Sequence, residues 1–312
     1  MINKSFSQRK SKILLESGTN EIEIVAFRVG AEFYGINVAK VREIIKGNIS
    51  IVPVPDSHLS VAGVVNLRGE IIPIVNLALH LKIKTEFDIK SSRIIIAEFN
   101  KIKVGFLVNE ATRIHRLSWE QVEEPSGLIN AASGYTVGVV RIEEHILFLL
   151  DYEKIAFLIN PDTNIQAVSE ADLKLNKSAS LDRQNKVIAV AEDSRLISTL
   201  IIDHLKKIGY QTILYKNGME AWLAIEAAAK LNSNITDTFH LLITDIEMPK
   251  MDGLHLISKI KANPKLKKFP CLVFSSMITK ELAAKCKSVG AKGQVPKPEI
   301  DQLIKLVDEY VL

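Results

Sequence analysis

The sequence predicts a protein of two domains, in which an all-β barrel or sandwich precedes a doubly wound α/β domain. Three observations carry this prediction. The chain has 312 residues, which is enough for two domains that each bury a core of their own. Its first half contains many short strand-like runs broken by Gly, Pro and Asn, whereas residues 181–312 alternate short apolar runs with amphipathic helical stretches. A polar stretch rich in Asn, Ser, Asp and Lys lies between the two patterns and resembles a flexible linker.

The expected boundaries follow from these patterns. They are a tail at 1–20, a β domain at 21–160, a linker at 161–185 and an α/β domain at 186–312.

Composition excludes several classes of protein. Hydrophobic residues make up 47% and charged residues 24%, a balance typical of folded globular domains. The net charge of +4 is small and the lysines are spread along the chain, so no nucleic-acid partner is expected. No run approaches the roughly 18 apolar residues of a membrane span, and the first twenty residues are polar, so we expect a cytoplasmic protein without direct membrane insertion. Cys271 and Cys286 are too few for a disulfide framework and are expected to be reduced core thiols.

The first domain is predicted to be built mostly of short strands. Clear strand-like runs lie at 22–29, 93–97 and 104–108, and frequent turn residues between such runs favour a barrel or sandwich. Only two helical stretches are expected, at 38–45 and 151–159.

A hairpin is the most informative part of this domain. Two apolar runs within residues 63–77 read as paired strands that meet at a turn containing Arg68 and Gly69, so Arg68 is expected at the hairpin tip. No nucleophile with a base, no metal-ligand cluster and no Gly-rich phosphate loop is found in this half of the sequence. We therefore predict a domain that binds other proteins and is not an enzyme.

The second domain is predicted to consist of five βα units. Its apolar runs lie at 187–191, 212–214, 241–244, 271–274 and near Val295. Runs that are apolar on both faces suit parallel strands covered by helices on each side. The clearest helix has Ser194 as candidate N-cap and Gly209 as its stop, and the last helix reaches the C-terminus.

Polar side chains follow four of these strands at the point where each strand ends. Glu192 and Asp193 follow the first, Asp245 the third, Ser275 the fourth and Lys297 the fifth. Because the carboxyl ends of parallel strands meet at one edge of a sheet, we expect these side chains to lie together.

This combination indicates phosphoryl chemistry. Three carboxylates repel one another unless a cation lies among them, and Mg²⁺ takes oxygen ligands and bridges a carboxylate to a phosphoryl oxygen. Lys297 and Ser275 can then neutralise the remaining phosphoryl oxygens, which leaves Asp245 as the nucleophile that accepts the phosphoryl group.

The second domain resembles the receiver domain of response regulators. The resemblance rests on Glu192 with Asp193, Asp245 followed by residues 248–253, residues 274–276, and Lys297 with Pro298. It implies a flavodoxin-like fold of five parallel strands and phosphorylation of Asp245 by a histidine kinase. Four residues would hold Mg²⁺: Glu192, Asp193, Asp245 and, through its backbone carbonyl, Glu247.

The receiver resemblance also assigns roles around the phosphoryl group. Ser275 would supply the switch hydroxyl, Lys297 would pair with the phosphoryl group, and the Lys297–Pro298 bond would be cis. Many receivers carry an aromatic switch residue just before this lysine, but here the switch position holds Gln294. The usual aromatic switching is therefore not expected.

The first domain resembles the CheW-like coupling domain. The stretch at 63–77 carries most of the likeness, together with residues 33–36, 41–44 and 146–151. The family fold is a pair of small SH3-like β-barrels, and its function is to bridge chemoreceptors to the chemotaxis histidine kinase. Arg68 matches the arginine associated with receptor contact, and Glu43 and Val41 are further candidates for protein binding.

The order of the two domains resembles the CheV family of chemotaxis proteins. The resemblance implies a scaffold in chemoreceptor arrays that links methyl-accepting chemoreceptors to the kinase and is modulated by phosphorylation of Asp245, as adaptation or as a phosphate sink. An alternative is a stand-alone phosphate-accepting response regulator of another pathway. A DNA-binding regulator would need a reader domain after the last helix, and a flavodoxin-like electron carrier would need a phosphate loop rich in Ser, Thr and Gly where this chain is acidic.

Overall fold

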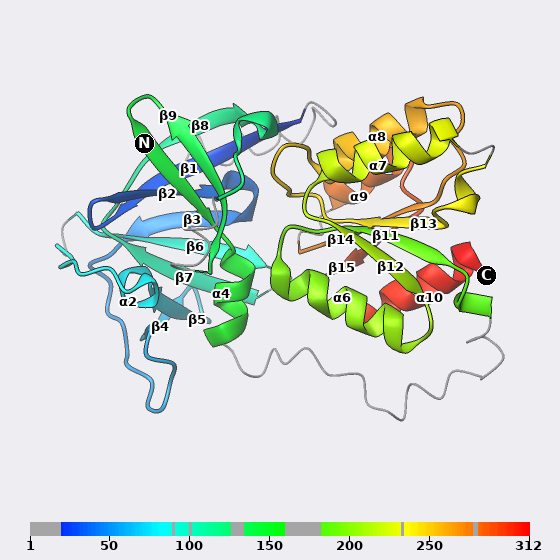
Figure 1. Ribbon diagram of the computed structural model, residues 1–312. Coiled ribbons are helices and arrows are strands. Elements are labelled where there is room, and N and C mark those ends of the chain that lie inside the picture. The colour runs from blue at the N-terminus through cyan, green and yellow to red at the C-terminus, as the bar shows by residue number, and fades with distance from the viewer. Residues whose placement is uncertain are drawn as a thin grey trace. The chain divides into compact units, whose positions relative to one another are not determined.

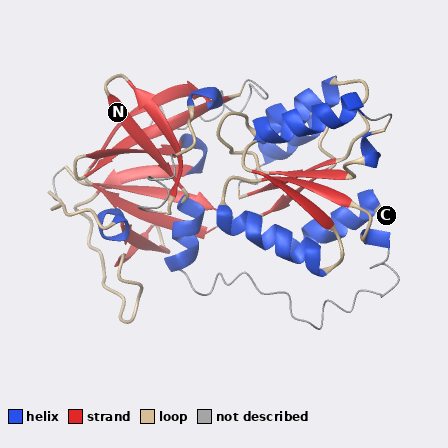
Figure 2. Cartoon of the chain, in the orientation of Figure 1, coloured by secondary structure: helices blue, strands red, loops and turns tan. Residues whose placement is uncertain are grey.

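The computed structural model describes residues 20–88, 91–99, 102–125, 134–159, 182–231, 234–276 and 280–312. The chain divides into two compact units, one rich in strands and one in which helices and strands alternate (Figure 1; Figure 2). The predicted tail at 1–20 lies outside the described residues except for Asn20. The predicted linker at 161–185 lies outside them up to residue 181.

The first unit contains two five-stranded sheets. One has the order β8-β1-β2-β10-β9 and the other the order β3-β6-β7-β5-β4. Their strands are β1 (Glu21–Val29), β2 (Glu32–Asn37), β3 (Val41–Lys46), β4 (Val61–Leu67), β5 (Glu70–Asn76), β6 (Arg93–Phe99), β7 (Ile102–Val108), β8 (Glu110–Ser118), β9 (Thr136–Ile142) and β10 (His145–Leu150). Neighbours are antiparallel except for the pairs β2 with β10 and β5 with β7. Two small sheets with a shared core fit the double-barrel prediction.

Short helices connect these strands. They are the 3₁₀ helices η1 (Val38–Lys40) and η2 (Trp119–Gln121) and the α-helices α2 (Leu77–Leu81) and α4 (Tyr152–Ile159). Helix α4 confirms the prediction for 151–159. The helical prediction for 38–45 is wrong beyond its first turn, because residues from Val41 onward pair with β6 as a strand. Three β-branched residues, Val41, Ile44 and Ile45, fit that pleated surface better than a helix.

The second unit is a parallel sheet with the order β12-β11-β13-β14-β15, and the doubly wound prediction is confirmed. Its strands are β11 (Val187–Ala191), β12 (Gln211–Tyr215), β13 (Leu241–Thr244), β14 (Cys271–Ser275) and β15 (Gly293–Pro296). Its helices are α6 (Arg195–Lys207), α7 (Gly218–Leu231), η4 (Ile235–Asp237), α8 (Gly253–Ala262), α9 (Lys280–Ser288) and α10 (Ile300–Val311). Helices α7, α8 and α9 cover one face of the sheet, and α6 and α10 cover the other (Figure 1).

The three central strands, β11, β13 and β14, each supply residues to both cores by alternation. In β13, Leu242 packs in the core under α7 and α8, while Leu241 and Ile243 pack in the core under α6 and α10. Ser194 caps α6 by accepting a hydrogen bond from the backbone N–H of Ile197, as predicted. Gly209 follows the helix in the left-handed region, with φ of 107°.

The described residues just before β11 are packed within the second unit. The guanidinium of Arg183 is buried and donates to both carboxylate oxygens of Asp308 on α10, at 3.0 and 2.6 Å. The hydroxyl of Tyr210 donates to the same carboxylate at 2.7 Å. Only the part of the predicted linker before residue 182 is thus outside the described packing.

Both cysteines are free and buried, as the sequence analysis predicts. Burial raises the pKa of the Cys271 thiol to about 12 and that of the Cys286 thiol to about 11. Both thiols therefore stay protonated, and a protonated thiol is a poor nucleophile.

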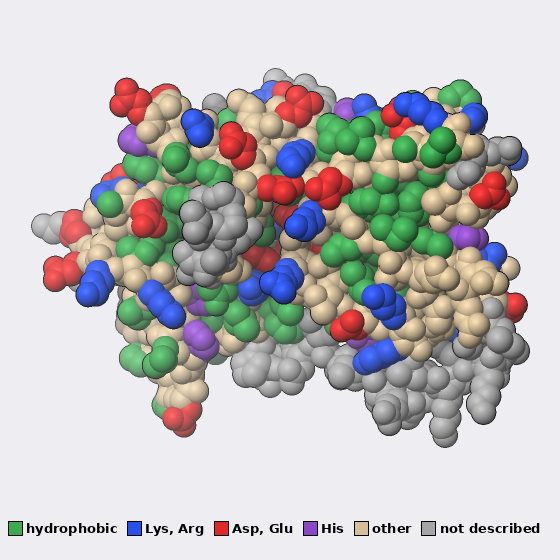
Figure 3. Space-filling view, viewed as in Figure 1, with side chains coloured by type: hydrophobic (Ala, Val, Ile, Leu, Met, Phe, Trp, Pro, Cys, Tyr) green, Lys and Arg blue, Asp and Glu red, His purple; other side chains and the backbone are tan. Residues whose placement is uncertain are grey.

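Apolar side chains also occur on the surface. Hydrophobic groups gather on the visible face of the second unit in Figure 3, and the edge strand β12 exposes Ile213 and Leu214. Among the described residues, no helix has the length and apolar content needed to cross a membrane.

Candidate functional site

Three acidic side chains meet at the carboxyl edge of the parallel sheet. Glu192 and Asp193 follow β11, and Asp245 follows the neighbouring strand β13. One carboxylate oxygen from each lies within 4.8 Å of the others. Glu192 and Asp245 are buried, and Asp193 is partly buried. In the part of the chain that the structure describes, this is the one group of three side chains able to hold a metal ion.

Lys297 brings a positive charge into this cluster. It follows β15, and its side chain is only 3% exposed. The ammonium nitrogen lies 2.9 Å from Glu192 Oε2 and 2.8 Å from Asp245 Oδ2. One cation therefore neutralises part of the charge of three carboxylates, and the cluster retains a negative charge when all three are ionised.

The electrostatics of the cluster favour a further cation. Burial raises the pKa of the Glu192 carboxyl well above its usual range, Lys297 opposes that shift, and Asp245 and Asp193 add to it. A divalent ion with oxygen preference would relieve the same repulsion, and carboxylates are its usual protein ligands. The three acids thus fit a magnesium site.

The backbone around Asp245 is tightly constrained. The Asp245 N–H donates to the Ala191 carbonyl at 2.9 Å, and the Asp245 carboxylate accepts from the Ile246 N–H at 2.6 Å. A Cβ atom on Gly253 would lie 1.9 Å from the Asp245 carbonyl oxygen, so only glycine fits at the start of α8. The Gly253 N–H donates to the Ile246 carbonyl at 2.9 Å, so the two ends of the loop from Ile246 to Asp252 are held together.

Ser275 lies at the same edge of the sheet. It is the last residue of β14 and is buried, and its carbonyl accepts from the Lys297 N–H at 3.0 Å. The Lys297–Pro298 peptide bond is cis, as the receiver resemblance implies. The structure thus brings Ser275 and Lys297 to the strand ends where the acids lie.

Gln294 stands at the predicted switch position in an unusual environment. It lies in β15 opposite Val273, on the face of the sheet that packs under α9. Its amide oxygen and amide nitrogen are both buried, and neither has a hydrogen-bond partner among the residues that the structure describes. An amide buried in this way is costly, in contrast to an aromatic ring at the same place.

The hairpin tip of the first unit holds the other predicted residues. Arg68 and Gly69 form the two-residue turn between β4 and β5, with φ of 55° and 89°, the pattern of a type I′ turn. The Arg68 side chain is 79% exposed, and its guanidinium lies 2.9 Å from the carboxylate of Glu43 on β3. Val41 is 0% exposed and packs inside the core, so its side chain does not reach a binding surface.

The structure shows two groups of polar contacts that no sequence motif predicts. Asn20 makes two hydrogen bonds to the loop after Asp245, 230 residues away in the chain. In the first unit, Ser60 Oγ lies 2.7 Å from His58 Nδ1 and 3.0 Å from Nδ1 of the buried His80. Burial lowers the pKa of His80 to about 4, with further contributions from His58 and Lys154.

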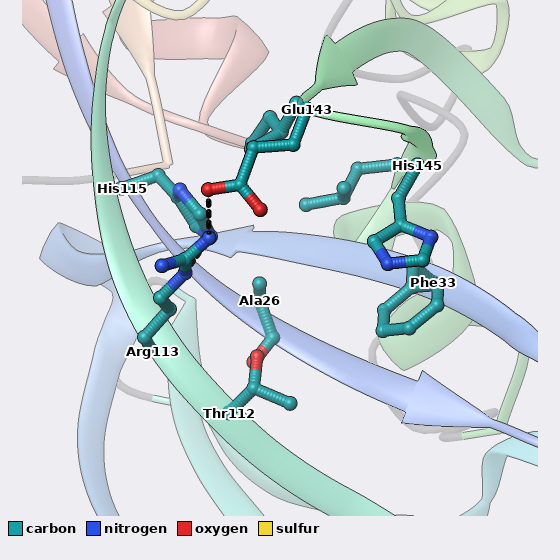
Figure 4. A pocket seen from close by; sticks show the side chains of 9 residues that line it. Ala26, Phe33, Thr112, Arg113, His115, Glu143 and His145 are labelled. Carbon is teal, nitrogen blue, oxygen red and sulfur yellow. Dashed lines mark hydrogen bonds and ion pairs between the residues drawn. The ribbon is translucent and has the colours of Figure 1, made fainter.

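A hollow of about 400 Å³ lies in the first unit between β8 and the β9–β10 turn (Figure 4). Arg113 and Glu143 form an ion pair across it at 2.5 Å, and the ring of His145 stacks on Phe33 with centroids 4.4 Å apart. Burial, then Arg113, lowers the pKa of His115 there. The described lining residues form no group of three metal ligands, so the acidic edge of the second unit is the stronger candidate for chemistry.

Comparison with known proteins agrees with this geometry. Residues 23–158 match the CheW-like domain family, and residues 188–308 match the response regulator receiver domain family. The chain is 31% identical to the chemotaxis protein CheV3 of Helicobacter pylori, over 94% of this chain and 95% of that protein. The chain belongs to the CheV family. This CheV-family protein is thus a chemotaxis coupling protein with a phosphorylatable receiver domain.

Solved structures resemble the two domains of this CheV-family chain separately. The scaffolding protein TtCheW from Thermoanaerobacter tengcongensis is 27% identical, covers 42% of this chain and 84% of its own, and gives a TM-score of 0.40. The chemotaxis protein CheY4 of Vibrio cholerae is 28% identical, covers 41% of this chain and 98% of its own, and gives a TM-score of 0.35.

Proposed function

We propose that this CheV-family protein links chemoreceptors to the chemotaxis histidine kinase, and that the kinase phosphorylates it on Asp245. The observation that supports the acceptor most directly is the contact of Lys297 with both Glu192 and Asp245 at the carboxyl edge of the sheet. The buried Lys297 ammonium lies between the two carboxylates. It can therefore pair with the phosphoryl oxygens when the Asp245 carboxylate becomes an acyl phosphate.

The proposed reaction is a phosphoryl transfer from a phosphohistidine. The Asp245 carboxylate attacks the phosphorus, a P–O bond forms, and the P–N bond to the imidazole breaks as that ring leaves and takes up a proton. Lys297 and the Ser275 hydroxyl would stabilise the phosphoryl oxygens. The ligands for Mg²⁺ would be Glu192, Asp193, Asp245 and the Glu247 carbonyl. When bound, that ion neutralises charge on the transferring group.

The first domain would supply the docking contacts. We assign receptor contact to Arg68 together with Glu43, because the type I′ turn fixes the Arg68 backbone at the hairpin tip and the exposed guanidinium pairs with Glu43. The protein would accordingly work in the cytoplasm, at chemoreceptor arrays. Phosphorylation of Asp245 would act on coupling as adaptation or would drain phosphoryl groups from the pathway.

Phosphoryl transfer from the cognate kinase tests the acceptor. The kinase is labelled with radioactive phosphate, mixed with magnesium and each full-length protein, and the label is followed over time. Label is expected on the wild type and on Asp237→Ala, an exposed acid before β13 at the opposite end of the strand, but not on Asp245→Ala. Label on Asp245→Ala would place the acceptor elsewhere, and no label on the wild type would make the receiver a plain binding module.

Sedimentation with receptor-containing membranes tests the docking surface. Arg68→Glu should reduce the bound fraction several-fold, because it removes a cation and places a carboxylate beside Glu43. Arg141→Glu, at an exposed arginine on β9, is the matched control. Equal losses in the two variants would show a general charge effect and exclude Arg68 as a specific contact.

A further inference from the structure

Asn20 belongs to the second compact unit although it stands immediately before β1 in the chain. Its side chain is buried, with 6% exposed, and it joins the loop that follows Asp245. The amide nitrogen donates to the Lys250 carbonyl at 3.3 Å, and the amide oxygen accepts from the Asp252 N–H at 3.1 Å. Asn20 thus forms hydrogen bonds with a loop whose residues lie far later in the sequence.

The two hydrogen bonds reproduce the pairing of a β-bridge. A carboxamide has the same donor and acceptor as a peptide group, and here it pairs with the carbonyl of one residue and the N–H of the residue two further on. Asn20 adopts φ of 58°, a left-handed conformation that asparagine tolerates better than most residues. Both the side chain and the backbone preference of Asn20 therefore suit this contact.

The contacted loop is the one that carries the candidate phosphorylation chemistry. It runs from Asp245 to α8, and Lys250 in its middle is itself held at φ of 64°. Asp252 ends it as the N-cap of α8, where its side chain accepts from the His255 N–H at 2.8 Å. Fixing the carbonyl of Lys250 and the N–H of Asp252 therefore limits how the whole segment from Ile246 to Asp252 can move.

We propose that Asn20 is a positioning residue for phosphoryl transfer to Asp245. It holds the loop in the shape that places Asp245 and the carbonyl of Glu247 for the incoming phosphoryl group and its metal ion. The proposal rests on the proposed function of Asp245. It gives the loop after Asp245 a supporting contact from a residue that stands 230 positions before Lys250 in the chain.

Three full-length variants test the role of Asn20. Asn20→Gly removes both hydrogen bonds while leaving the left-handed backbone accessible. Asn20→Asp keeps the acceptor for the Asp252 N–H and loses the donor to Lys250, so an intermediate effect is expected. Asn234→Ala is the matched control, because Asn234 also accepts a backbone hydrogen bond, from the Thr236 N–H, but precedes β13 and so lies at the opposite end of the strand from Asp245.

Two readouts separate the role of Asn20 from that of Asp245. The first is the rate of phosphorylation by acetyl phosphate with saturating magnesium, which should fall about three- to tenfold in Asn20→Gly. The second is hydrogen–deuterium exchange of the Asp252 amide, which should become faster in the same variant. Asn234→Ala should leave both unchanged.

The outcomes are distinct. An Asp252 amide that exchanges as slowly in Asn20→Gly as in the wild type overturns the proposal, whether or not phosphorylation occurs. Faster exchange with an equal or faster phosphorylation rate overturns the positioning role as well. If the wild type takes no phosphoryl group, the proposed function of Asp245 fails, and with it the role of Asn20 in transfer, while the exchange data still report whether Asn20 holds the loop.

Discussion

Lys297 and Arg68 show two opposite ways in which this protein pairs charges. Lys297 is 3% exposed and faces two carboxylates inside the receiver, whereas Arg68 is 79% exposed and faces one carboxylate at a hairpin tip. Burying an ion pair costs a desolvation free energy about as large as the electrostatic attraction between its charges. An exposed pair loses little solvation and gains little attraction. Under the proposed function, the buried cluster would serve phosphoryl chemistry and the exposed pair would serve recognition.

The largest expected effect is the loss of the buried cation. Lys297→Met should lower the free energy of unfolding by about 3 kcal/mol in the absence of divalent ions, because it leaves Glu192 and Asp245 buried without their partner. Urea unfolding followed by circular dichroism measures this. Magnesium should recover more stability in the variant than in the wild type. The exposed Lys305→Met is the control, and a drop of similar size there would remove the contrast between the two environments.

His80 extends the comparison to a neutral buried group. Its pKa is about 4 in the folded protein and near 6.5 when unfolded, so the unfolded chain binds more protons between these values. Stability should be full above pH 6.5 and decline as the pH falls toward 4. His80→Leu should weaken that decline, measured as the shift of the urea midpoint between pH 7 and pH 4.5. The same shift in variant and wild type would show that His80 does not contribute.

Gln294 offers a buried polar group without charge. Gln294→Leu should raise the free energy of unfolding by about 1–2 kcal/mol, because it replaces an amide whose two polar atoms find no partner in the described part of the chain. Thermal unfolding of the full-length protein measures the gain, and Gln302→Leu on the exposed side of α10 is the matched control. A destabilised Gln294→Leu would mean that the amide contributes favourable interactions in solution.

The smallest effect is expected at the hairpin tip. Arg68→Ala should change the free energy of unfolding by less than about 1 kcal/mol, since the ion pair with Glu43 is exposed to water and salt. Urea unfolding at low and at high salt measures it. A loss as large as that of Lys297→Met would break the distinction drawn between the two ion pairs.

Sequence reasoning was strongest where one physical rule links distant residues. The acids, Ser275 and Lys297 could be placed together because parallel strands end at one edge, and each residue directly follows or ends an apolar run. The same reasoning failed for 38–45, whose apolar spacing suits a helix but whose β-branched residues pair with β6. The spacing of apolar residues within one segment does not reveal that a strand some fifty residues later pairs with that segment.

Other features depend on contacts that a sequence does not display. Nothing in the sequence around Asn20 indicates that its side chain bonds to a loop 230 residues away, because any exposed segment can carry an asparagine. Gln294 could be recognised as a departure from the aromatic pattern, but its lack of hydrogen-bond partners emerges only when neighbouring side chains are in place. The family resemblance makes Val41 a candidate for protein binding, and only the packed core shows that its side chain points inward.

The two buried cysteines make this protein convenient for site-specific labelling. Cys271 and Cys286 are enclosed in the receiver core with strongly raised pKa values, so neither should react with a maleimide under native conditions. A cysteine introduced at an exposed position, such as Leu59→Cys at a site 94% exposed, would then take up the dye selectively. Fluorescent probes could be attached without first removing the natural thiols and disturbing the packing under α8 and α9.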